Sequence, residues 1–139
     1  MLWPMQVTLS SSLHAALLAK AGATHPLECC GLLFGGVSNV LRIEPAANIS
    51  PDPARAFEID PAQLIAAERA MRTGGDQLIG HYHSHPNGRA EPSPRDAAAS
   101  AGDGRLWLII AGGAITGWRA NPGGALLGAF DPVALEIGD

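Results

Sequence analysis

Apolar residues recur with the period of a helix in two parts of the chain. Residues 13–23 form an amphipathic segment, which one of the preceding serines can cap and which Gly22 is expected to end. A second helix is predicted from Pro61 to about Arg72, because Asp60 is a favourable N-cap residue and proline is favourable in the first turn. The positions expected to face the core are Leu13, Leu17 and Ala21 in the first helix and Leu64, Ala67 and Met71 in the second.

Strand patterns occupy most of the remaining chain. Residues 29–36 and 106–111 are nearly continuous apolar runs, which is typical of strands buried on both faces. Residues 40–43 alternate between apolar and polar and are predicted to pair with the run before them as a hairpin that Pro45 stops. The other expected strands are 56–59, 77–85, 115–120 and 125–130, with a turn at 121–124. This order of elements predicts an α/β (α+β) protein with helices packed on a mixed sheet.

The composition indicates one domain over residues 1–139. With 47% hydrophobic and 16% charged residues, the chain can bury one core but is too short for two ordinary domains. A formal net charge of -4 and scattered basic residues argue against binding to nucleic acid or to an anionic membrane. No apolar stretch approaches the roughly 20 residues of a transmembrane helix. The apolar segment near the N-terminus has no basic residue before it, unlike a signal peptide.

Two adjacent cysteines, Cys29 and Cys30, are the only thiols of the chain. They do not form a disulfide framework and they lie in an apolar run, so we interpret them as small buried hydrophobic residues. Cys29 follows Glu28 directly and could still line a site there. This cysteine usage favours a reducing compartment, and we expect the protein to be cytoplasmic.

Histidines alternate along the strand predicted over residues 77–85. Since successive side chains of a strand point to opposite faces, His81, His83 and His85 share one face and Tyr82 and Ser84 the other. Two imidazoles separated by one residue on a strand are close enough to share one metal ion. A histidine at each alternate position would crowd a single ion, so we favour a flanking role for His81, although a third imidazole as a ligand stays open.

A short helix is predicted to follow, from Ser93 and Pro94 to about Ser100. Ser93 at the N-cap and Asp96 three residues later describe an ordinary helix start. The same helix start would also bring the carboxylate of Asp96 close to the end of the histidine strand, where it could bind a metal ion. A helix cap and a metal ligand are compatible roles for this residue. Two imidazoles, one carboxylate and an open position for water are typical of a catalytic zinc site, whereas structural zinc sites are closed by four protein ligands.

These residues carry a resemblance to a known family. The run His83-Ser84-His85-Pro86, with Ser93 eight residues after His85 and Asp96 three residues further on, resembles the signature of the JAMM (MPN-domain) metalloproteases. That family also has an upstream glutamate, and Glu28 matches its place. The similarity extends from about Thr24 to Trp118. The segments around the 60–75 helix and after Asp96 are short, as in the compact single-domain prokaryotic members of the family.

The resemblance implies the fold and the role of each site residue. It implies the MPN fold, a three-layer arrangement similar to that of the cytidine deaminases. It also implies that His83, His85 and Asp96 bind Zn²⁺, that Glu28 acts as the general base, and that Ser93 donates a hydrogen bond to the oxyanion. Deaminase chemistry itself is not indicated, since it needs His-x-Glu and a later Cys-x-x-Cys.

Amide hydrolysis is the reaction that this resemblance implies. The favoured substrate is a ubiquitin-like or sulfur-carrier protein cut after its Gly-Gly C-terminus. Two alternatives are a hydrolase of small peptides or amino-acid conjugates with the same zinc site, and a non-catalytic MPN scaffold that binds partners. The scaffold normally lacks one or more ligands, which this chain retains. The sequence leaves the oligomeric state open, a homodimer included.

Overall fold

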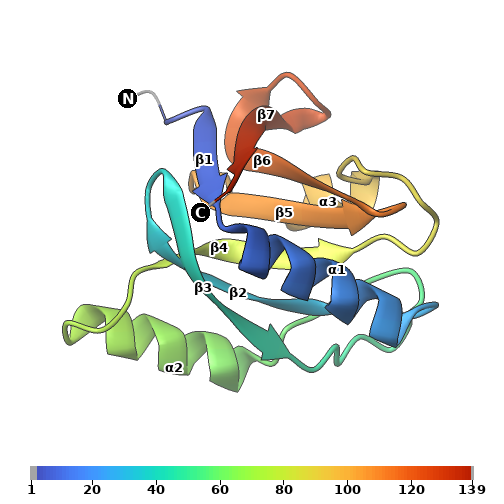
Figure 1. Ribbon diagram of the computed structural model, residues 1–139, viewed down its shortest axis with the longest axis horizontal. Helices are drawn as coiled ribbons and strands as arrows, with labels where there is room; N and C mark the ends of the chain where they lie inside the picture. The colour runs from blue at the N-terminus through green and yellow to red at the C-terminus, as the bar shows by residue number, and fades with distance from the viewer. Residues whose placement is uncertain (1–2, 139) are drawn as a thin grey trace.

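The computed structural model of the chain describes residues 3–138, and within this range seven strands and three helices are formed (Figure 1). The first half contains β1 Gln6–Leu9, α1 Ser11–Thr24, β2 Cys30–Gly36, β3 Asn39–Ala46 and α2 Pro61–Arg72. The second half contains β4 Leu78–Ser84, α3 Pro94–Ala99, β5 Leu106–Ala111, β6 Ala114–Gly124 and β7 Gly128–Ile137. The described helices include none that is both long and apolar enough to span a membrane.

The strands form one mixed sheet that closes on itself in the order β1-β3-β2-β4-β5-β6-β7. Closure comes from β1, which pairs in parallel with both β3 and β7. The histidine strand β4 lies in the interior of the sheet, antiparallel to β2 and parallel to β5. The predicted mixed sheet with packed helices is therefore confirmed.

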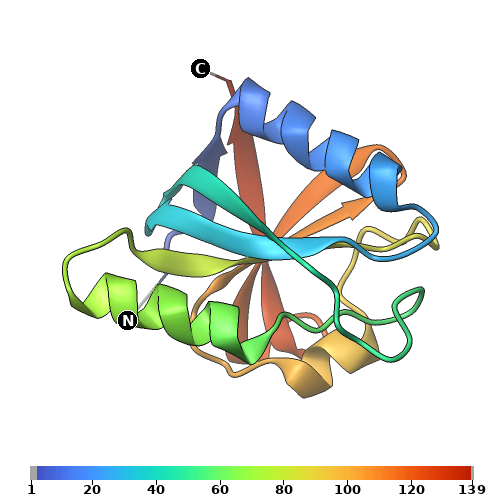
Figure 2. The same cartoon turned by 90° about the horizontal axis from the view of Figure 1, so that it is seen from below.

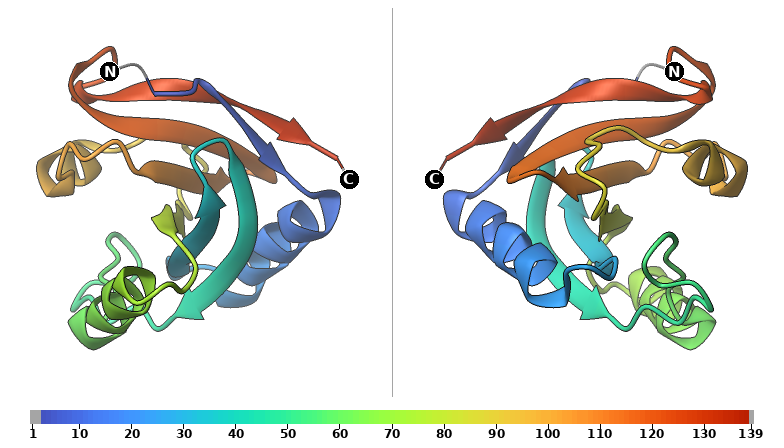
Figure 3. Two further views of the ribbon diagram at one scale, coloured as in Figure 1. Left: turned by 90° about the vertical axis from the view of Figure 1, so that its left-hand side faces the viewer. Right: turned by 90° about the vertical axis from the view of Figure 1, so that its right-hand side faces the viewer.

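The helices cover opposite sides of the central strands. Figures 2 and 3 show α1 on one side of β2 and β4, and α2 and α3 on the other. Leu17 of α1 is fully buried in the larger apolar core, and Ala67 of α2 is buried in a second apolar cluster. The predicted core-facing positions are confirmed, since Leu13 and Ala21 pack against the first cluster and Leu64 and Met71 against the second.

Helix α2 has the predicted bounds, but α1 extends beyond its predicted end. The side chain of Asp60 caps α2 by accepting a hydrogen bond from the Ala62 N–H at 2.9 Å. In α1, Ser10 is the N-cap and the helix continues to Thr24, so the expected end at Gly22 was wrong. Glycine lowers helix stability without forbidding the conformation, and the chain leaves the helix just before Pro26, which lacks an N–H.

Two predictions for the first half of the sheet were wrong. Strand β3 continues through Pro45, which pairs with Gly31. Beyond Val40, no strand of the described residues pairs with the outer side of β3, and proline is tolerated at such an edge. Residues 56–59 form only an isolated bridge between Asn48 and Ile59 instead of a strand.

The C-terminal part of the chain differs most from the prediction. Residues 121–124 continue β6 instead of forming a turn, and the register of its pairing with β7 shifts between Ala120 and Gly124. The turn falls at residues 125–127, where Leu127 adopts a φ of 54°. Strand β7 therefore begins at Gly128, near the end of the predicted strand, and runs to Ile137. Strand β1 was not predicted.

Candidate metal centre

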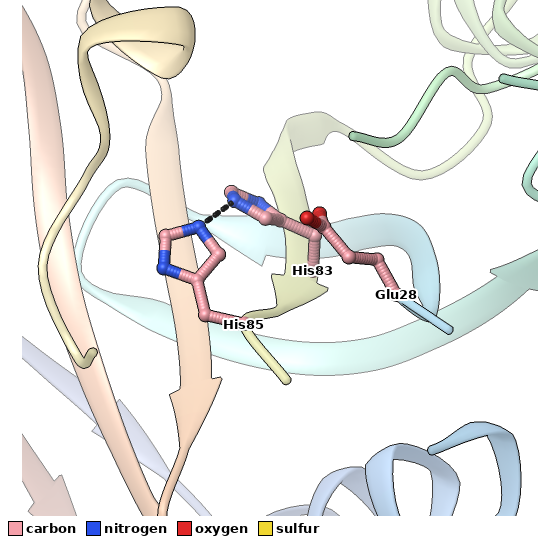
Figure 4. A group of neighbouring side chains, drawn as sticks. All are labelled: Glu28, His83 and His85. Carbon is pink, nitrogen blue, oxygen red and sulfur yellow. Dashed lines mark hydrogen bonds between the residues drawn. The ribbon is translucent and has the colours of Figure 1, made fainter. Parts of the chain in front are cut away.

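His83 and His85 project from the end of β4 toward one point, as their spacing predicts (Figure 4). His83 is fully buried and lies between Cys30 of β2 and Ile109 of β5. Its Nε2 atom is 3.0 Å from the Nε2 atom of His85. The Nδ1 atom of His85 lies 2.8 Å from the carbonyl oxygen of Arg89. Because a carbonyl only accepts, Nδ1 carries the proton, and the lone pair of Nε2 in His85 is available to a metal.

Asp96 brings a carboxylate to the two imidazoles from the first turn of α3. Its Oδ2 atom lies 3.3 Å from Nε2 of His83 and 3.1 Å from Nε2 of His85. Burial opposes ionisation of Asp96, but its hydrogen bonds with the two histidines outweigh burial and lower the pKa of the carboxyl below its usual range. The carboxyl group of Asp96 is therefore ionised, as a metal ligand must be.

The predicted helix cap is formed by the same residues. The Asp96 N–H donates to the Ser93 hydroxyl at 3.1 Å, and the Ser93 N–H donates to Oδ2 of Asp96 at 2.9 Å. This capping box is confirmed. It holds Oδ2 in place, so the local fold of α3 and the geometry of the site depend on the same two residues.

The two Nε2 atoms and the Oδ2 atom fit one face of a zinc coordination sphere. With Zn–N and Zn–O bonds of about 2.0–2.1 Å, neighbouring ligands of a tetrahedral site lie about 3.3–3.4 Å apart. The three atoms of His83, His85 and Asp96 are separated by 3.0 to 3.3 Å. Three protein ligands leave a fourth position open. The donor set thus suits a catalytic zinc ion, which these residues are predicted to bind.

Glu28 reaches the same point from the residue that precedes Cys29 and β2. One of its carboxylate oxygens, one ring nitrogen of His83 and one ring nitrogen of His85 lie within 4.8 Å of one another (Figure 4). Its backbone is fixed on both sides, since its N–H donates to the Pro53 carbonyl at 2.8 Å and its own carbonyl accepts from Asn48 at 3.1 Å. Burial raises the pKa of Glu28 to about 7. A carboxylate with this pKa is suited to accept and release protons near neutral pH.

His81 lies beside the centre without joining it. Its ring centroid is 5.9 Å from that of His83, 4.2 Å from that of Trp107 and 5.2 Å from that of Phe57. Its Nε2 atom is buried and has no hydrogen-bond partner among the described residues. Burial lowers the pKa of His81 to about 3, so its ring is neutral. This position agrees with the flanking role that crowding along the strand favours.

A cavity of about 680 Å³ opens onto the centre and runs along β4. Its polar lining includes Glu28, Ser93 and Asp96 of the centre, together with Arg55, Glu58, Arg95 and Arg105. Its apolar lining includes Leu32, Phe57, Leu64, Leu78 and Trp107.

Two aromatic residues of the cavity were not assigned to the site by sequence. Phe57 stacks on His83 with ring centroids 4.2 Å apart. It falls in a segment predicted as a strand, and no local signal in the sequence indicates the contact. Trp107 belongs to the apolar run over residues 106–111 and is buried as that run predicts, but it also lines the cavity. It pairs with His81 across β4 and β5, a register that the sequence does not reveal.

The cysteines are buried and free, as predicted. Cys29 belongs to the larger apolar core and Cys30 to the cluster beneath α2. The Cys29 N–H donates to the Ser84 hydroxyl at 2.8 Å, which fastens the end of β4 to the segment that carries Glu28. Burial raises the pKa of Cys30 to about 12, so this thiol is protonated at neutral pH and is a poor metal ligand.

Comparison with known proteins gives the family. A family model described as prokaryotic homologues of the JAB domain matches residues 10–121, which is most of the chain. The chain belongs to this family. This JAB domain is thereby a member of the JAMM (MPN-domain) group, and the resemblance noted from its motif is confirmed.

Two curated relatives of the JAB domain are named as enzymes. A desampylase from Haloferax volcanii is 34% identical over 95 residues, which cover 66% of this chain and 68% of that protein. A probable TtuB-protein conjugate cleaving protease from Thermus thermophilus is 44% identical over 83 residues, which cover 60% of this chain and 53% of that protein. The match thus spans about half the length of the second relative. Relatives with these names show that the JAB domain is an enzyme.

Solved structures agree with the fold. The solution structure of a protein from Desulfitobacterium hafniense has a TM-score of 0.79 and is 26% identical, with 96% of this chain and 94% of that chain covered. The crystal structure of a JAB1/MPN domain protein from Archaeoglobus fulgidus has a TM-score of 0.60 and is 18% identical, with 96% and 97% covered. The predicted MPN fold is confirmed.

Proposed function

We propose that this JAB domain is a zinc-dependent peptidase or isopeptidase that hydrolyses the amide bond after the Gly-Gly C-terminus of a ubiquitin-like or sulfur-carrier protein. The observation that carries the proposal is the convergence of Nε2 of His83, Nε2 of His85 and Oδ2 of Asp96 within 3.0 to 3.3 Å, beside the carboxylate of Glu28. The names of the two relatives, a desampylase and a probable protease for TtuB-protein conjugates, support a protein conjugate as the substrate.

His83, His85 and Asp96 would hold the zinc ion. When bound, zinc polarises a carbonyl group and lowers the pKa of a coordinated water toward about 7. Glu28 would accept the proton of the attacking water and pass it to the leaving amine, whose protonation allows the C–N bond to break. Its raised pKa suits both steps, because the carboxyl group must release the proton that it has gained.

Ser93 is proposed to stabilise the oxyanion that forms on the scissile carbonyl. In the helix cap its hydroxyl oxygen accepts from the Asp96 N–H. A hydroxyl that accepts through its lone pair keeps its proton free to donate. Ser93 also lines the cavity at the metal centre. Capping and a hydrogen bond to the oxyanion are therefore compatible.

The shape of the centre supports small residues next to the scissile bond. Phe57 covers His83 at a centroid distance of 4.2 Å, and His83 is fully buried beneath it. A substrate backbone must pass close to this aromatic wall to bring a carbonyl to the centre. Glycine offers the closest approach of a backbone, since it has no side chain. A Gly-Gly tail fits this requirement.

The first test is the zinc content of the purified protein, measured by elemental analysis. We expect about one zinc per chain in the wild type, loss of zinc in Asp96→Ala, and retention of zinc in the control His81→Ala. Zinc that follows His81 instead of Asp96 would show that the proposed ligand set is wrong. A chain that binds no zinc after reconstitution would favour a non-catalytic scaffold.

The second test separates the substrate classes. Wild-type protein loaded with zinc is incubated with a carrier protein fused through its Gly-Gly C-terminus to a lysine side chain, and with short peptides of the same sequence. We expect cleavage of the conjugate with release of an intact Gly-Gly terminus. Efficient cleavage of the short peptides together with an uncut conjugate would instead indicate a small-peptide hydrolase.

A further inference from the structure

The loop between β4 and α3 holds two of the proposed metal ligands. It covers residues 85–93 and passes the hairpin between β5 and β6 on its way to α3 (Figure 1). The Arg89 carbonyl of this loop lies 2.8 Å from Nδ1 of His85 and orients that imidazole. At the end of the loop, the Ser93 N–H donates to Oδ2 of Asp96 at 2.9 Å. The directions of His85 and Asp96 therefore depend on where the loop lies.

Two hydrogen bonds of the loop are formed within it. The Gly88 N–H donates to the His85 carbonyl at 3.0 Å, and the Arg89 N–H donates to the Asn87 side chain at 2.9 Å. Bonds between such near neighbours shape a turn, but they do not place it relative to the sheet. A surface loop is mobile unless another element holds it. The Arg89 carbonyl can orient His85 only if the loop is fixed from outside.

Thr116 of β6 provides such a contact. Its hydroxyl donates to the Ala90 carbonyl at 2.6 Å, one residue after the carbonyl that orients His85. The Nε1–H of Trp118 in turn donates to the Thr116 oxygen at 3.0 Å. Because an indole N–H can only donate and a carbonyl can only accept, the direction of both hydrogen bonds is fixed. Thr116 thus ties the middle of the loop to the sheet.

The strand register explains why Thr116 reaches the loop. Thr116 pairs with Ile109 of β5, and Ile109 pairs with His83 of β4. Residues that are paired across neighbouring strands point to the same face of a sheet. Thr116 therefore lies on the face of the sheet that carries the metal centre, two strands away from His83. The loop meets Thr116 on this face before it enters α3.

We propose that Thr116 is a positioning residue of the metal centre, which holds the loop so that the Arg89 carbonyl orients His85 and the first turn of α3 presents Asp96. This inference rests on the proposed function, because the two ligands are those of the proposed zinc site. Partners that orient metal ligands typically change metal affinity about 10- to 100-fold. Thr116 acts one step further out, through the loop, so we expect an effect at the low end of this range.

Zinc dissociation constants, measured by competition with a chelating dye, test the proposal. Thr116→Val keeps the shape of the side chain and removes the hydroxyl, and it should bind zinc about 10-fold more weakly than the wild type. Thr116→Ser keeps the hydroxyl and should restore the affinity of the wild type. Thr73→Val is the matched control, since it removes a hydroxyl that also donates to backbone carbonyls, at the end of α2. Its affinity for zinc should be unchanged.

A merely structural role of Thr116 predicts a different result. Thr116→Val would then lower the urea midpoint while its zinc dissociation constant stays that of the wild type, and this outcome would overturn the inference. Weaker zinc binding that Thr116→Ser does not restore would also overturn it. If Thr116→Val does not fold, Thr116→Cys takes its place, because a thiol is a weak donor. Zinc affinity of Thr116→Cys equal to that of the wild type would count against the inference in the same way.

Failure of the proposed function can be recognised separately. If the wild type binds zinc but cleaves no conjugate, the peptidase proposal fails, and the zinc dissociation constants still decide the role of Thr116. If the wild type binds no zinc, amide hydrogen exchange of the metal-free proteins decides it. Exchange at Gly88, Arg89 and Ser93 that is about 5- to 10-fold faster in Thr116→Val, with β5 unchanged, supports the role of Thr116 in holding the loop. Equal exchange in the two proteins overturns it.

Discussion

Replacing Glu28 by glutamine should abolish most of the activity and make the metal-free protein more stable. The side chain is 6% exposed, and its pKa rises from an ordinary value of 4.5 to about 7. Glutamine has nearly the same shape and carries no charge. The change therefore removes the proton acceptor without removing side-chain volume, and it also removes a carboxylate that burial destabilises.

The size of the stability gain follows from the two pKa values of Glu28. In the unfolded chain the carboxyl group ionises above about pH 4.5, whereas in the folded protein it stays protonated up to about pH 7. Folding of the wild type therefore takes up a proton between these values, and its stability falls as the pH rises. At about 1.4 kcal/mol per pKa unit, the advantage of Glu28→Gln grows from about 1 kcal/mol at pH 5 to about 3 kcal/mol at pH 8.

Urea denaturation of the EDTA-treated proteins at pH 5 and pH 8 measures this difference. At an m-value of about 2 kcal/mol/M, 3 kcal/mol corresponds to a midpoint about 1.5 M higher at pH 8. Glu91→Gln, which changes an exposed glutamate, is the matched control and should stay within about 0.5 kcal/mol of the wild type. A gain that is absent, or that does not depend on pH, would refute the burial of an ionisable Glu28.

The zinc-loaded protein supplies the second half of this prediction. Glu28→Gln should keep its zinc, because the proposed ligands are unchanged, and lose about 100- to 10,000-fold in turnover. Full activity of this variant would remove Glu28 from the mechanism. A variant that is both less active and less stable would indicate a disrupted site instead of a missing base.

Two further predictions concern the helix cap and the pH profile. Ser93→Ala should lower the free energy of unfolding by about 1 kcal/mol, because the helix cap is lost. It should also lower kcat, because the hydrogen bond to the oxyanion is lost. An unchanged melting temperature would argue against the capping contribution. The kcat/KM of the wild type should fall as the pH decreases through the pKa of Glu28, because protonated Glu28 cannot accept a proton. This pKa lies at or below about 7 in the zinc-loaded protein, since a bound cation can only lower the pKa of a carboxyl group. A pH profile of kcat/KM that stays constant down to pH 4.5 would contradict this prediction.

The sequence predicts the site better than the strand boundaries around it, for a physical reason. His83 and His85 are separated by one residue on a strand, and Ser93 and Asp96 by three residues at a helix start. Both spacings fix side-chain directions locally, through the period of two in a strand and the capping box of a helix. Short-range geometry therefore brings each pair together, His83 with His85 and Ser93 with Asp96. The contact between the two pairs depends on how the chain between β4 and α3 folds.

The errors arise where distant segments decide the outcome. Pro45 stays in β3 because no strand within residues 3–138 pairs with its outer side. Residues 121–124 continue β6 because β7 pairs with them through a shifted register, although their composition is that of a turn. Phe57 belongs to a segment with little regular structure, and its contact with His83 depends on how that segment folds over β4. Local propensity contains none of this information.

One buried group at the cavity is unfavourable in the folded chain and has a proposed use. Glu28 loses its charge below about pH 7 because it is buried. Its position is nevertheless fixed, since its backbone N–H donates to the Pro53 carbonyl and its carbonyl accepts from Asn48. A carboxylate held where its charge is disfavoured is better explained by catalysis than by stability. Greater stability of Glu28→Gln together with weaker catalysis is the pattern that this reasoning requires.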